Sequence, residues 1–167
     1  MRALAQRVTH GSVRVGEETV GEIAGGLVVL VGVGQQDGPA EAEWLANKIA
    51  TLRIFGDDAG RFNRSLLDTG GAALVVSQFT LYADARKGRR PSFIQAAPPE
   101  QAEALVERLA ATLRGLGVST ATGRFRSHML VEILNDGPVT IWLDTDELRP
   151  TQSNAERGTR NAELRPE

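Results

Sequence analysis

The order of apolar and polar positions predicts several strands in the first third of the chain. Apolar and polar residues alternate over 3–8, 12–15 and 19–23, which is typical of strands with one buried face. Residues 27–33 then form a continuous apolar run rich in valine, typical of a strand that is buried on both faces. We therefore expect a meander of short strands that leads into a central strand.

Two helices are predicted in the middle of the chain, with a second buried strand between them at 72–76. The first helix begins at Pro39, and its apolar positions are Trp44, Leu45, Ile49 and Leu52. A turn-rich segment over 56–71 separates this helix from the strand. The second helix begins near Pro98, and its apolar positions are Ala102, Leu105, Leu109 and Leu113. Gly115 and Gly117 mark its end.

The last third of the folded region is expected to form three strands, at 118–122, 129–134 and 139–143. The final two are separated by Asn135-Asp136-Gly137-Pro138, which combines the strongest turn formers. We therefore predict a hairpin at this point. The whole pattern indicates an α+β domain with mixed sheets and two main helices.

From Arg149 onward the chain has almost no apolar residues and cannot bury enough surface to offset its ordering entropy. We therefore expect a single domain over 1–148 and a disordered tail over 149–167. No apolar run approaches the roughly 20 residues that span a bilayer. The first residues also lack the apolar region of a signal peptide, so we expect a cytoplasmic protein with no membrane partner.

Composition narrows the chemistry that side chains can provide. The chain has 19 basic and 21 acidic side chains among 167 residues, an ordinary balance for a globular domain. It has no cysteine, which excludes disulfides, thiolate metal sites and a cysteine nucleophile. Its two histidines, His10 and His128, offer little material for a histidine metal centre. We expect neither a metal nor a cofactor.

Two common catalytic or binding patterns fail on inspection. The glycines of residues 32–38 lie between a strand and a helix, but Asp37 occupies the third glycine position of a dinucleotide fingerprint and the lysine of a P-loop is missing. This segment is better interpreted as a turn. Ser77 lacks the flanking glycines of a hydrolase elbow. Its base would have to be His10 or His128, which we interpret as surface or structural residues.

Paired carboxylates are also better explained by structure than by a glycosidase dyad. Asp57 and Asp58 stand beside Gly60 and indicate turn chemistry, whereas Asp144 and Asp146 follow the last strand.

One segment, residues 77–80, is more informative. It places three hydrogen-bonding side chains directly after a core strand, where binding groups and free N–H donors often gather.

Four motifs in a fixed order carry a family resemblance. They are Ser77-Gln78-Phe79-Thr80-Leu81, Gly88-Arg89-Arg90-Pro91-Ser92-Phe93, Thr122-Gly123-Arg124-Phe125 and Asn135-Asp136-Gly137-Pro138-Val139-Thr140. The opening Gln6-Arg7-Val8 and the strand over 26–32 agree with them. Together these segments resemble the D-aminoacyl-tRNA deacylase family over nearly the whole domain, from Met1 to about Leu143.

The resemblance implies hydrolysis of the ester that joins a D-amino acid to the terminal adenosine of tRNA. It also implies action on glycyl-tRNA, including glycine mischarged on tRNA-Ala, in translation quality control. The implied fold is a β-rich, layered β/β/α homodimer with active sites at the interface. Gly137 and Pro138, joined by a cis bond in the family, would form a wedge that enters the partner subunit and rejects L-amino acids.

The resemblance further implies roles for individual residues. Ser77, Gln78, Phe79 and Thr80 would bind substrate, with Ala97 as a pocket wall and Met129 as a contact. The N–H groups of Phe79 and Thr80 would stabilise an oxyanion. Thr80 is a possible nucleophile, but no base for it is evident, so we favour assistance by the ribose hydroxyl of the substrate. Arg7 would brace the wedge.

Basic residues in the irregular segment 83–99 suggest where tRNA phosphates bind. They are Arg86, Lys87, Arg89 and Arg90, with Arg61 and Arg64 as further candidates. The competing interpretation is a solvated loop. A second hypothesis for the whole chain is a non-catalytic tRNA-binding module of the same fold, which would bind charged tRNA without releasing the amino acid. The tail is either a disordered extension or a further RNA contact.

Overall fold

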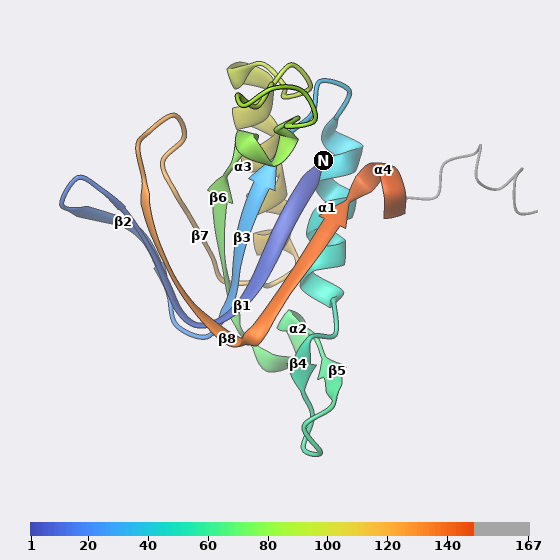
Figure 1. Ribbon diagram of the computed structural model, residues 1–167. Helices are drawn as coiled ribbons and strands as arrows, with labels where there is room; N and C mark the ends of the chain where they lie inside the picture. The colour runs from blue at the N-terminus through green and yellow to red at the C-terminus, as the bar shows by residue number, and fades with distance from the viewer. Residues whose placement is uncertain (149–167) are drawn as a thin grey trace, which may run out of the picture.

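A six-stranded mixed sheet forms the centre of the computed structural model, which describes residues 1–148 (Figure 1). The strands of the sheet are β1 (Arg2–Val15), β2 (Glu18–Ile23), β3 (Gly26–Gly32), β6 (Ala72–Ser77), β7 (Thr120–Thr122) and β8 (Leu130–Asp144). A separate small hairpin consists of β4 (Phe55–Gly56) and β5 (Phe62–Arg64). The expected tail over 149–167 lies outside the described residues.

Two long helices and three short ones accompany the sheet. They are α1 (Pro39–Thr51), α2 (Leu66–Thr69), the 3₁₀ helix η1 (Phe79–Tyr82), α3 (Pro99–Gly115) and α4 (Thr145–Leu148). The two main helices and the central strands β3 and β6 agree with the sequence prediction. Among residues 1–148, none of the helices has the length and apolar character needed to cross a membrane.

The sheet has the order β2-β1-β3-β6-β7, with β8 on the opposite edge of β1. Pairing is antiparallel around β1 and parallel from β3 to β6 and β7. The far strands β2 and β7 come together, because a Cβ placed on Gly21 would lie 2.5 Å from the carbonyl oxygen of Thr122. A glycine at this position lets the sheet curl until it is nearly closed.

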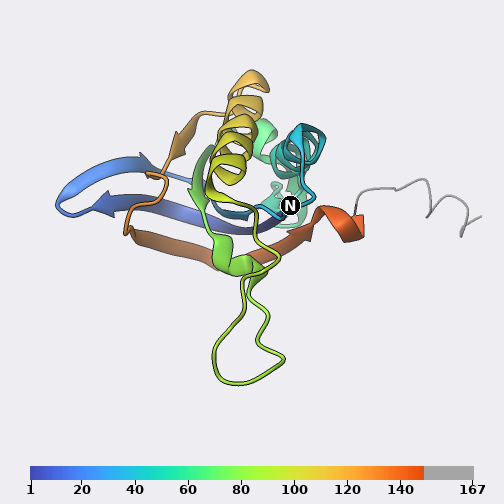
Figure 2. The ribbon, with the colours of Figure 1, turned by 90° about the horizontal axis from the view of Figure 1, so that it is seen from above.

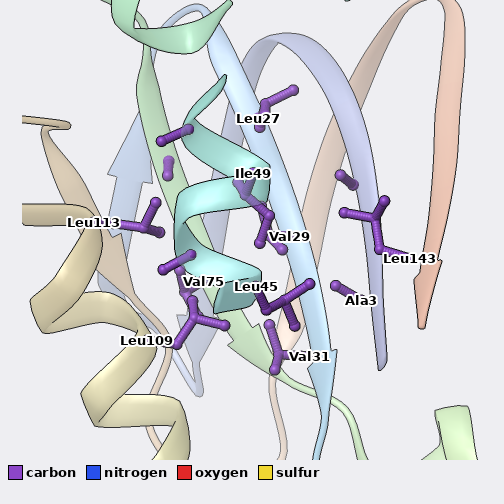
Figure 3. Close-up of a cluster of buried hydrophobic side chains, with 14 of the residues drawn as sticks. Ala3, Leu27, Val29, Val31, Leu45, Ile49, Val75, Leu109, Leu113 and Leu143 are labelled. Atoms are coloured by element: carbon purple, nitrogen blue, oxygen red, sulfur yellow. The ribbon is translucent and has the colours of Figure 1, made fainter. Parts of the chain in front are cut away.

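Two apolar cores hold the layers together. In the first, Leu45 and Ile49 of α1 and Leu109 and Leu113 of α3 pack against the sheet around Val29 (Figure 3). The second lies within the curve of the sheet and contains Val8, Val13, Ile23, Val28, Leu74 and Val76. The helix faces predicted from apolar spacing are the faces that are buried. The result is a β-rich α+β fold with helices on one face of a curved sheet.

The predicted hairpin at 135–138 is wrong. Arg14 pairs with Leu130 and Arg2 pairs with Asp144, so β8 runs along the whole of β1 without reversing. The turn-forming residues instead make a bulge, in which Arg7 alone lies opposite residues 136–139. Proline is tolerated in a bulge because no ladder hydrogen bond is required of it there. Long-range pairing with β1 therefore outweighs the local turn signal.

The strands predicted separately at 3–8 and 12–15 are likewise one strand, β1, bent where its register with β8 shifts. The turn-rich segment before β6 contains the β4–β5 hairpin and α2 as well as turns. Within it, the Asp57 carboxylate accepts hydrogen bonds from the N–H groups of Ala59 and Arg61, both at 2.9 Å. These bonds hold the pKa of Asp57 below its usual value. The expected turn chemistry is confirmed.

Candidate active site

A cavity of about 730 Å³ opens between the ends of β3 and β6, the start of α3 and the loop that precedes β8. Five of the predicted site residues line it: Ser77, Gln78, Phe79, Ala97 and Met129. Further lining residues are Val31, Val33, Phe93, Ala96, Pro99, Ala102, Val106, Phe125, Arg126, Ser127, His128 and Val131. The cavity is thus mostly apolar with a polar edge, a composition typical of small-molecule pockets.

The segment after β6 supplies one wall of this cavity. The N–H of Gln78 donates to the carbonyl of Val31 at 2.7 Å, which extends the pairing of β6 with β3 by one residue. Helix η1 then begins at Phe79. The N–H groups of Phe79 and Thr80 are the first two of this helix, so no carbonyl within the helix can accept them. They are available to a ligand oxygen.

Thr80 itself is exposed and is not among the residues that line the cavity. Among the described residues, its hydroxyl has one hydrogen bond, which it accepts from the side-chain amide of Gln78. An amide N–H donates a proton and cannot take one from a hydroxyl. The surroundings of Thr80 therefore do not activate it as a nucleophile.

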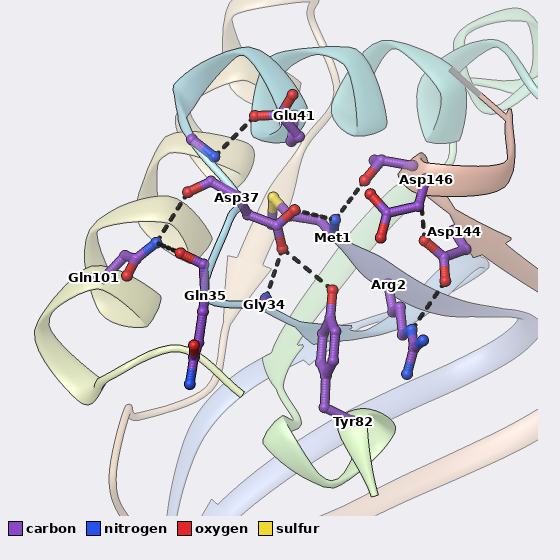
Figure 4. Close-up of polar contacts among 12 residues, drawn as sticks. Met1, Arg2, Gly34, Gln35, Asp37, Glu41, Tyr82, Gln101, Asp144 and Asp146 are labelled. Carbon is purple, nitrogen blue, oxygen red and sulfur yellow. Dashed lines mark hydrogen bonds and ion pairs between the residues drawn. The ribbon is translucent and has the colours of Figure 1, made fainter. Parts of the chain in front are cut away.

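Arg2, at the start of β1, holds the other end of η1. Its guanidinium donates to the carbonyl oxygen of Leu81 at 3.1 Å and lies 4.3 Å from the centre of the Tyr82 ring. The Asp144 carboxylate accepts a further bond from Arg2 at 2.9 Å (Figure 4). Cation–π stacking and a charged hydrogen bond together fix the helix against the sheet.

Asp37 connects η1 to the turn between β3 and α1. Its carboxylate accepts from the Tyr82 hydroxyl at 3.2 Å and from the N–H of Gly34 at 2.6 Å, and it pairs with the Met1 ammonium at 2.5 Å (Figure 4). Burial, together with the Asp37 charge, raises the pKa of Tyr82 well above its usual value, so the hydroxyl remains a donor. The carboxylate of Asp37 occupies the Gly34 N–H of this glycine-rich segment, in keeping with the interpretation of residues 32–38 as a turn.

The opposite walls are held by backbone contacts. The N–H of Ala97 donates to the Val33 carbonyl at 2.9 Å, and the Phe93 ring meets the Phe79 ring edge-on with 5.0 Å between centroids. In the motif Thr122–Phe125, a Cβ on Gly123 would lie 2.7 Å from the Met129 sulfur. Glycine at this position therefore makes room for Met129 at the cavity.

Of the predicted RNA-binding cations, Arg86, Lys87, Arg89 and Arg90 lie on a loop that leaves η1 and projects from the body of the molecule (Figure 2). The further candidates Arg61 and Arg64 lie instead at the β4–β5 hairpin, where they pair with Asp57 and Asp58. Paired backbone bonds between Asp84 and Ser92, at 2.8 and 2.9 Å, close its base. Arg86 is bonded to Asp84 at 2.7 Å, and this contact lowers the pKa of Asp84 to about 2. Within residues 1–148, the exposed side chains of Lys87, Arg89 and Arg90 form no ion pair. This leaves a local positive charge beside the cavity.

Gly137 and Pro138 are not brought to the cavity of their own chain. Two residues of β1 show how far apart the bend and η1 are. Arg7 donates to the carbonyl of Asp136 in the bend at 3.2 Å, and Arg2 contacts η1. Arg7 lies five residues along β1 from Arg2. Five strand residues span about 16 Å. Figure 1 accordingly shows the bend of β8 at the bottom of the view, near β4 and β5, where β1 itself bends about midway along its length. The Gly137–Pro138 peptide bond is cis.

Comparison with known protein families identifies the family of this chain. A family model described as D-Tyr-tRNA(Tyr) deacylase matches residues 4–144. The chain belongs to this family. The D-aminoacyl-tRNA deacylase resemblance seen in the motifs is therefore confirmed, and the chain is a hydrolase.

Two deacylase relatives show how close the match is. The D-aminoacyl-tRNA deacylase of Thermomicrobium roseum is 63% identical over 149 residues, covering 89% of this chain and 97% of the relative. That of Heliobacterium modesticaldum is 61% identical over 144 residues, covering 86% and 96%.

Solved structures agree in fold with the deacylase family. A structure described as c-Myc DNA Unwinding Element Binding Protein has a TM-score of 0.81 at 40% identity, covering 86% of this chain and 98% of its own. A structure described as a probable eukaryotic D-amino acid tRNA deacylase has a TM-score of 0.77 with the same coverage. At 17% identity, the second comparison shows the shared fold only.

Some residues of this deacylase site could not be found from the sequence. Arg2 and Asp37 support η1 from separate parts of the chain, through Leu81 and Tyr82 of that helix, and no local pattern joins them. His128 is exposed, in agreement with its interpretation as a surface histidine, and it also lines the cavity together with Arg126. The other histidine, His10, lies on the exposed sheet between Glu22 and Glu132, with contacts of 2.9 and 2.8 Å. The hydrogen bond to Glu22 raises the pKa of His10.

Proposed function

We propose that this chain hydrolyses the ester bond of D-aminoacyl-tRNA, releasing free D-amino acid and tRNA. The observation that carries the proposal is the cavity lined by Ser77, Gln78, Phe79, Ala97 and Met129 in a chain of this family. Residues 1–148 make up the catalytic domain in this account. The substrate class follows from the family and from the relatives' shared name.

The chemistry requires stabilisation of one developing charge. Water attacks the ester carbonyl, the carbonyl oxygen becomes an oxyanion, and the 3′ oxygen of the terminal ribose then leaves. The N–H groups of Phe79 and Thr80 are suited to the oxyanion because they are free at the start of η1. A fixed donor of this kind contributes about 10²–10³-fold to the rate of acyl transfer.

Thr80 acts through its backbone in this account, and we expect Thr80→Ala to keep kcat within about tenfold of the wild type, since a nucleophile needs an activating base. The substituted chain retains the N–H of residue 80 and loses a hydroxyl that accepts a bond from Gln78. Single-turnover release of D-tyrosine from tRNA measures the effect. Loss of turnover with unchanged affinity for the charged tRNA would instead identify Thr80 as the nucleophile.

The discrimination between D- and L-amino acids is assigned to the bend at Gly137 and Pro138, entering the cavity of a second subunit. Support comes from its position about 16 Å along β1 from η1 of the same chain. Within residues 1–148, strand β8 pairs only with β1, and it carries Leu130, Leu134 and Trp142, exposed by 57%, 52% and 44%. Apolar side chains of this size on an open strand suit contact with a second copy of the chain.

Steric rejection by the bend extends the substrate class to glycine. A D-amino acid directs its side chain away from such a wedge, and glycine has no side chain to reject. Glycyl-tRNA, including glycine mischarged on tRNA-Ala, is therefore included as a substrate.

Light scattering tests the assembly separately from the chemistry. A monomer that hydrolyses D-aminoacyl-tRNA would overturn the wedge acting between subunits while leaving the hydrolysis intact.

The basic loop is proposed to bind tRNA phosphates. We expect the triple change Lys87→Ala, Arg89→Ala and Arg90→Ala to weaken tRNA binding, and to reduce the slope of log affinity against log salt by about two to three. Filter binding at several salt concentrations measures both quantities. The matched control is Arg14→Ala, an exposed arginine on β1. An unchanged salt slope in the triple variant would contradict a phosphate-binding role.

Turnover of D-tyrosyl-tRNA tests the proposed function. We expect a catalytic amount of the protein to release many equivalents of D-tyrosine. The alternative, a non-catalytic tRNA-binding module, predicts saturable binding of the charged tRNA with no release above the spontaneous rate. That outcome would overturn the hydrolase assignment in favour of a binding function.

A further inference from the structure

The side chain of Asn135 closes the bend in β8. Its amide nitrogen donates to the carbonyl oxygen of Arg7 at 3.0 Å and to the carbonyl oxygen of Val139 at 3.0 Å. A side-chain amide has two N–H donors on one nitrogen, so both are used. One of the two bonds fastens the bend to β1, and the other joins its two ends.

These two bonds replace ladder bonds that the bulge removes. Val8 pairs with Asn135 and Gln6 pairs with Thr140, so the intervening residue of β1 has no single partner on β8. Pro138 has no N–H to offer. A half-buried carbonyl left without a donor destabilises the fold. Asn135 supplies these donors from a short side chain with few rotatable bonds, which fixes the bend closely.

Arg7 holds the bend from the other side. Its Nε donates to the Asp136 carbonyl at 3.2 Å, and its Nη1 donates to the Ile54 carbonyl at 2.8 Å. The guanidinium also lies 5.5 Å from the centre of the Phe62 ring on β5. Asn135 and Arg7 therefore form a frame around the bend, with contacts to β1, β5 and the segment before β4.

The interior of this frame has no free space at Gly137. A Cβ built there would lie 2.7 Å from a Val139 methyl carbon and 3.2 Å from an Arg7 guanidinium nitrogen. The backbone at Gly137 also has φ of 132°, a value that disfavours side chains. The bend is consequently a rigid backbone surface whose position depends on the groups around it.

We propose that Asn135 is a specificity-determining positioning residue for the rejection of L-aminoacyl-tRNA. This inference rests on the proposed function, in which the bend enters the partner's cavity as a steric wedge. A steric wedge excludes a side chain only if it is held to within about 0.5 Å. Loss of the two amide bonds frees the bend from β1 and lets it yield to an L side chain, so that L-aminoacyl-tRNA reaches the N–H donors of η1.

The test compares hydrolysis of L- and D-tyrosyl-tRNA by Asn135→Asp, which keeps the shape of the side chain and removes both donors. We expect the L-to-D ratio of kcat/KM to rise by about tenfold or more, because two net hydrogen bonds are lost. The matched control is Asn47→Asp on α1, whose amide donates to the Glu43 carbonyl at 2.9 Å far from the bend. It is expected to leave the ratio unchanged.

A second variant, Asn135→Ser, is measured in the same way, together with the melting temperature of each protein. If Asn135→Asp does not fold, the ratio for Asn135→Ser decides. A lower melting temperature with an unchanged L-to-D ratio would overturn the proposal, because it would show that Asn135 has a structural role alone. A wild type that fails to hydrolyse D-tyrosyl-tRNA would contradict the proposed function instead, so the two failures are distinguishable.

Discussion

Replacing Ala97 with phenylalanine is expected to lower kcat/KM for D-tyrosyl-tRNA by about a hundredfold or more. Ala97 lines the cavity, and its N–H is bonded to the Val33 carbonyl at 2.9 Å. The backbone is therefore tied to the residue that follows β3 and cannot easily move the new ring away. A phenyl group in a cavity of about 730 Å³ takes the space in which the aminoacyl ester must be oriented. Misplacement of substrate by 1 Å alone can cost about 10²-fold.

The measurement is steady-state release of D-tyrosine, with thermal unfolding to verify that the variant folds. The matched control is Ala111→Phe, which adds the same ring to the exposed face of α3. That variant should retain wild-type activity. If Ala97→Phe retained activity within tenfold of the wild type, the substrate would bind elsewhere than in this cavity.

A second large effect on the hydrolysis rate is expected when the 2′-hydroxyl of the substrate's terminal ribose is removed. D-tyrosyl-tRNA that ends in 2′-deoxyadenosine should be hydrolysed about a hundredfold or more slowly than the natural substrate. Positioned proton-transfer groups contribute about 10²–10⁴-fold to such reactions. Among residues 1–148, the Thr80 hydroxyl contacts the Gln78 amide and no carboxylate or imidazole. We therefore expect the vicinal hydroxyl of the ribose to assist proton transfer at the ester.

Single-turnover rates with saturating protein measure this effect apart from binding. The control is the affinity of the protein for the deoxy substrate, which is expected to change little. Equal single-turnover rates for the two substrates would show that a protein side chain supplies the proton transfer. His128, at the edge of the cavity, would then be the first residue to substitute.

Local patterns predicted the elements of the fold better than their connections. The apolar spacing in α1 and α3 and the valine-rich runs of β3 and β6 are properties of short segments, and all were found from the sequence. The bend at residues 135–138 was predicted as a hairpin because its composition is that of a turn. The pairing of β8 with the whole of β1 decides otherwise, and that pairing joins residues more than 100 positions apart.

The same distinction applies to the candidate site. Residues 77–79 were identified because they are contiguous and follow a core strand, and the cavity indeed lies against them. The supports of η1 were missed, because Arg2 and Asp37 are ordinary residues in their local sequence and meet η1 only after folding. Thr80 was placed in the binding site by its motif, but it is exposed and does not line the cavity.

The central proposed property of this chain is hydrolysis that distinguishes the two enantiomers of the aminoacyl group. The most direct measurement is kcat/KM of the wild-type protein for D-tyrosyl-tRNA and L-tyrosyl-tRNA prepared on the same tRNA. We expect a preference for the D form of at least about a hundredfold, because the proposed wedge would exclude the L side chain by steric contact. Equal rates for the two, or faster hydrolysis of the L form, would contradict the account.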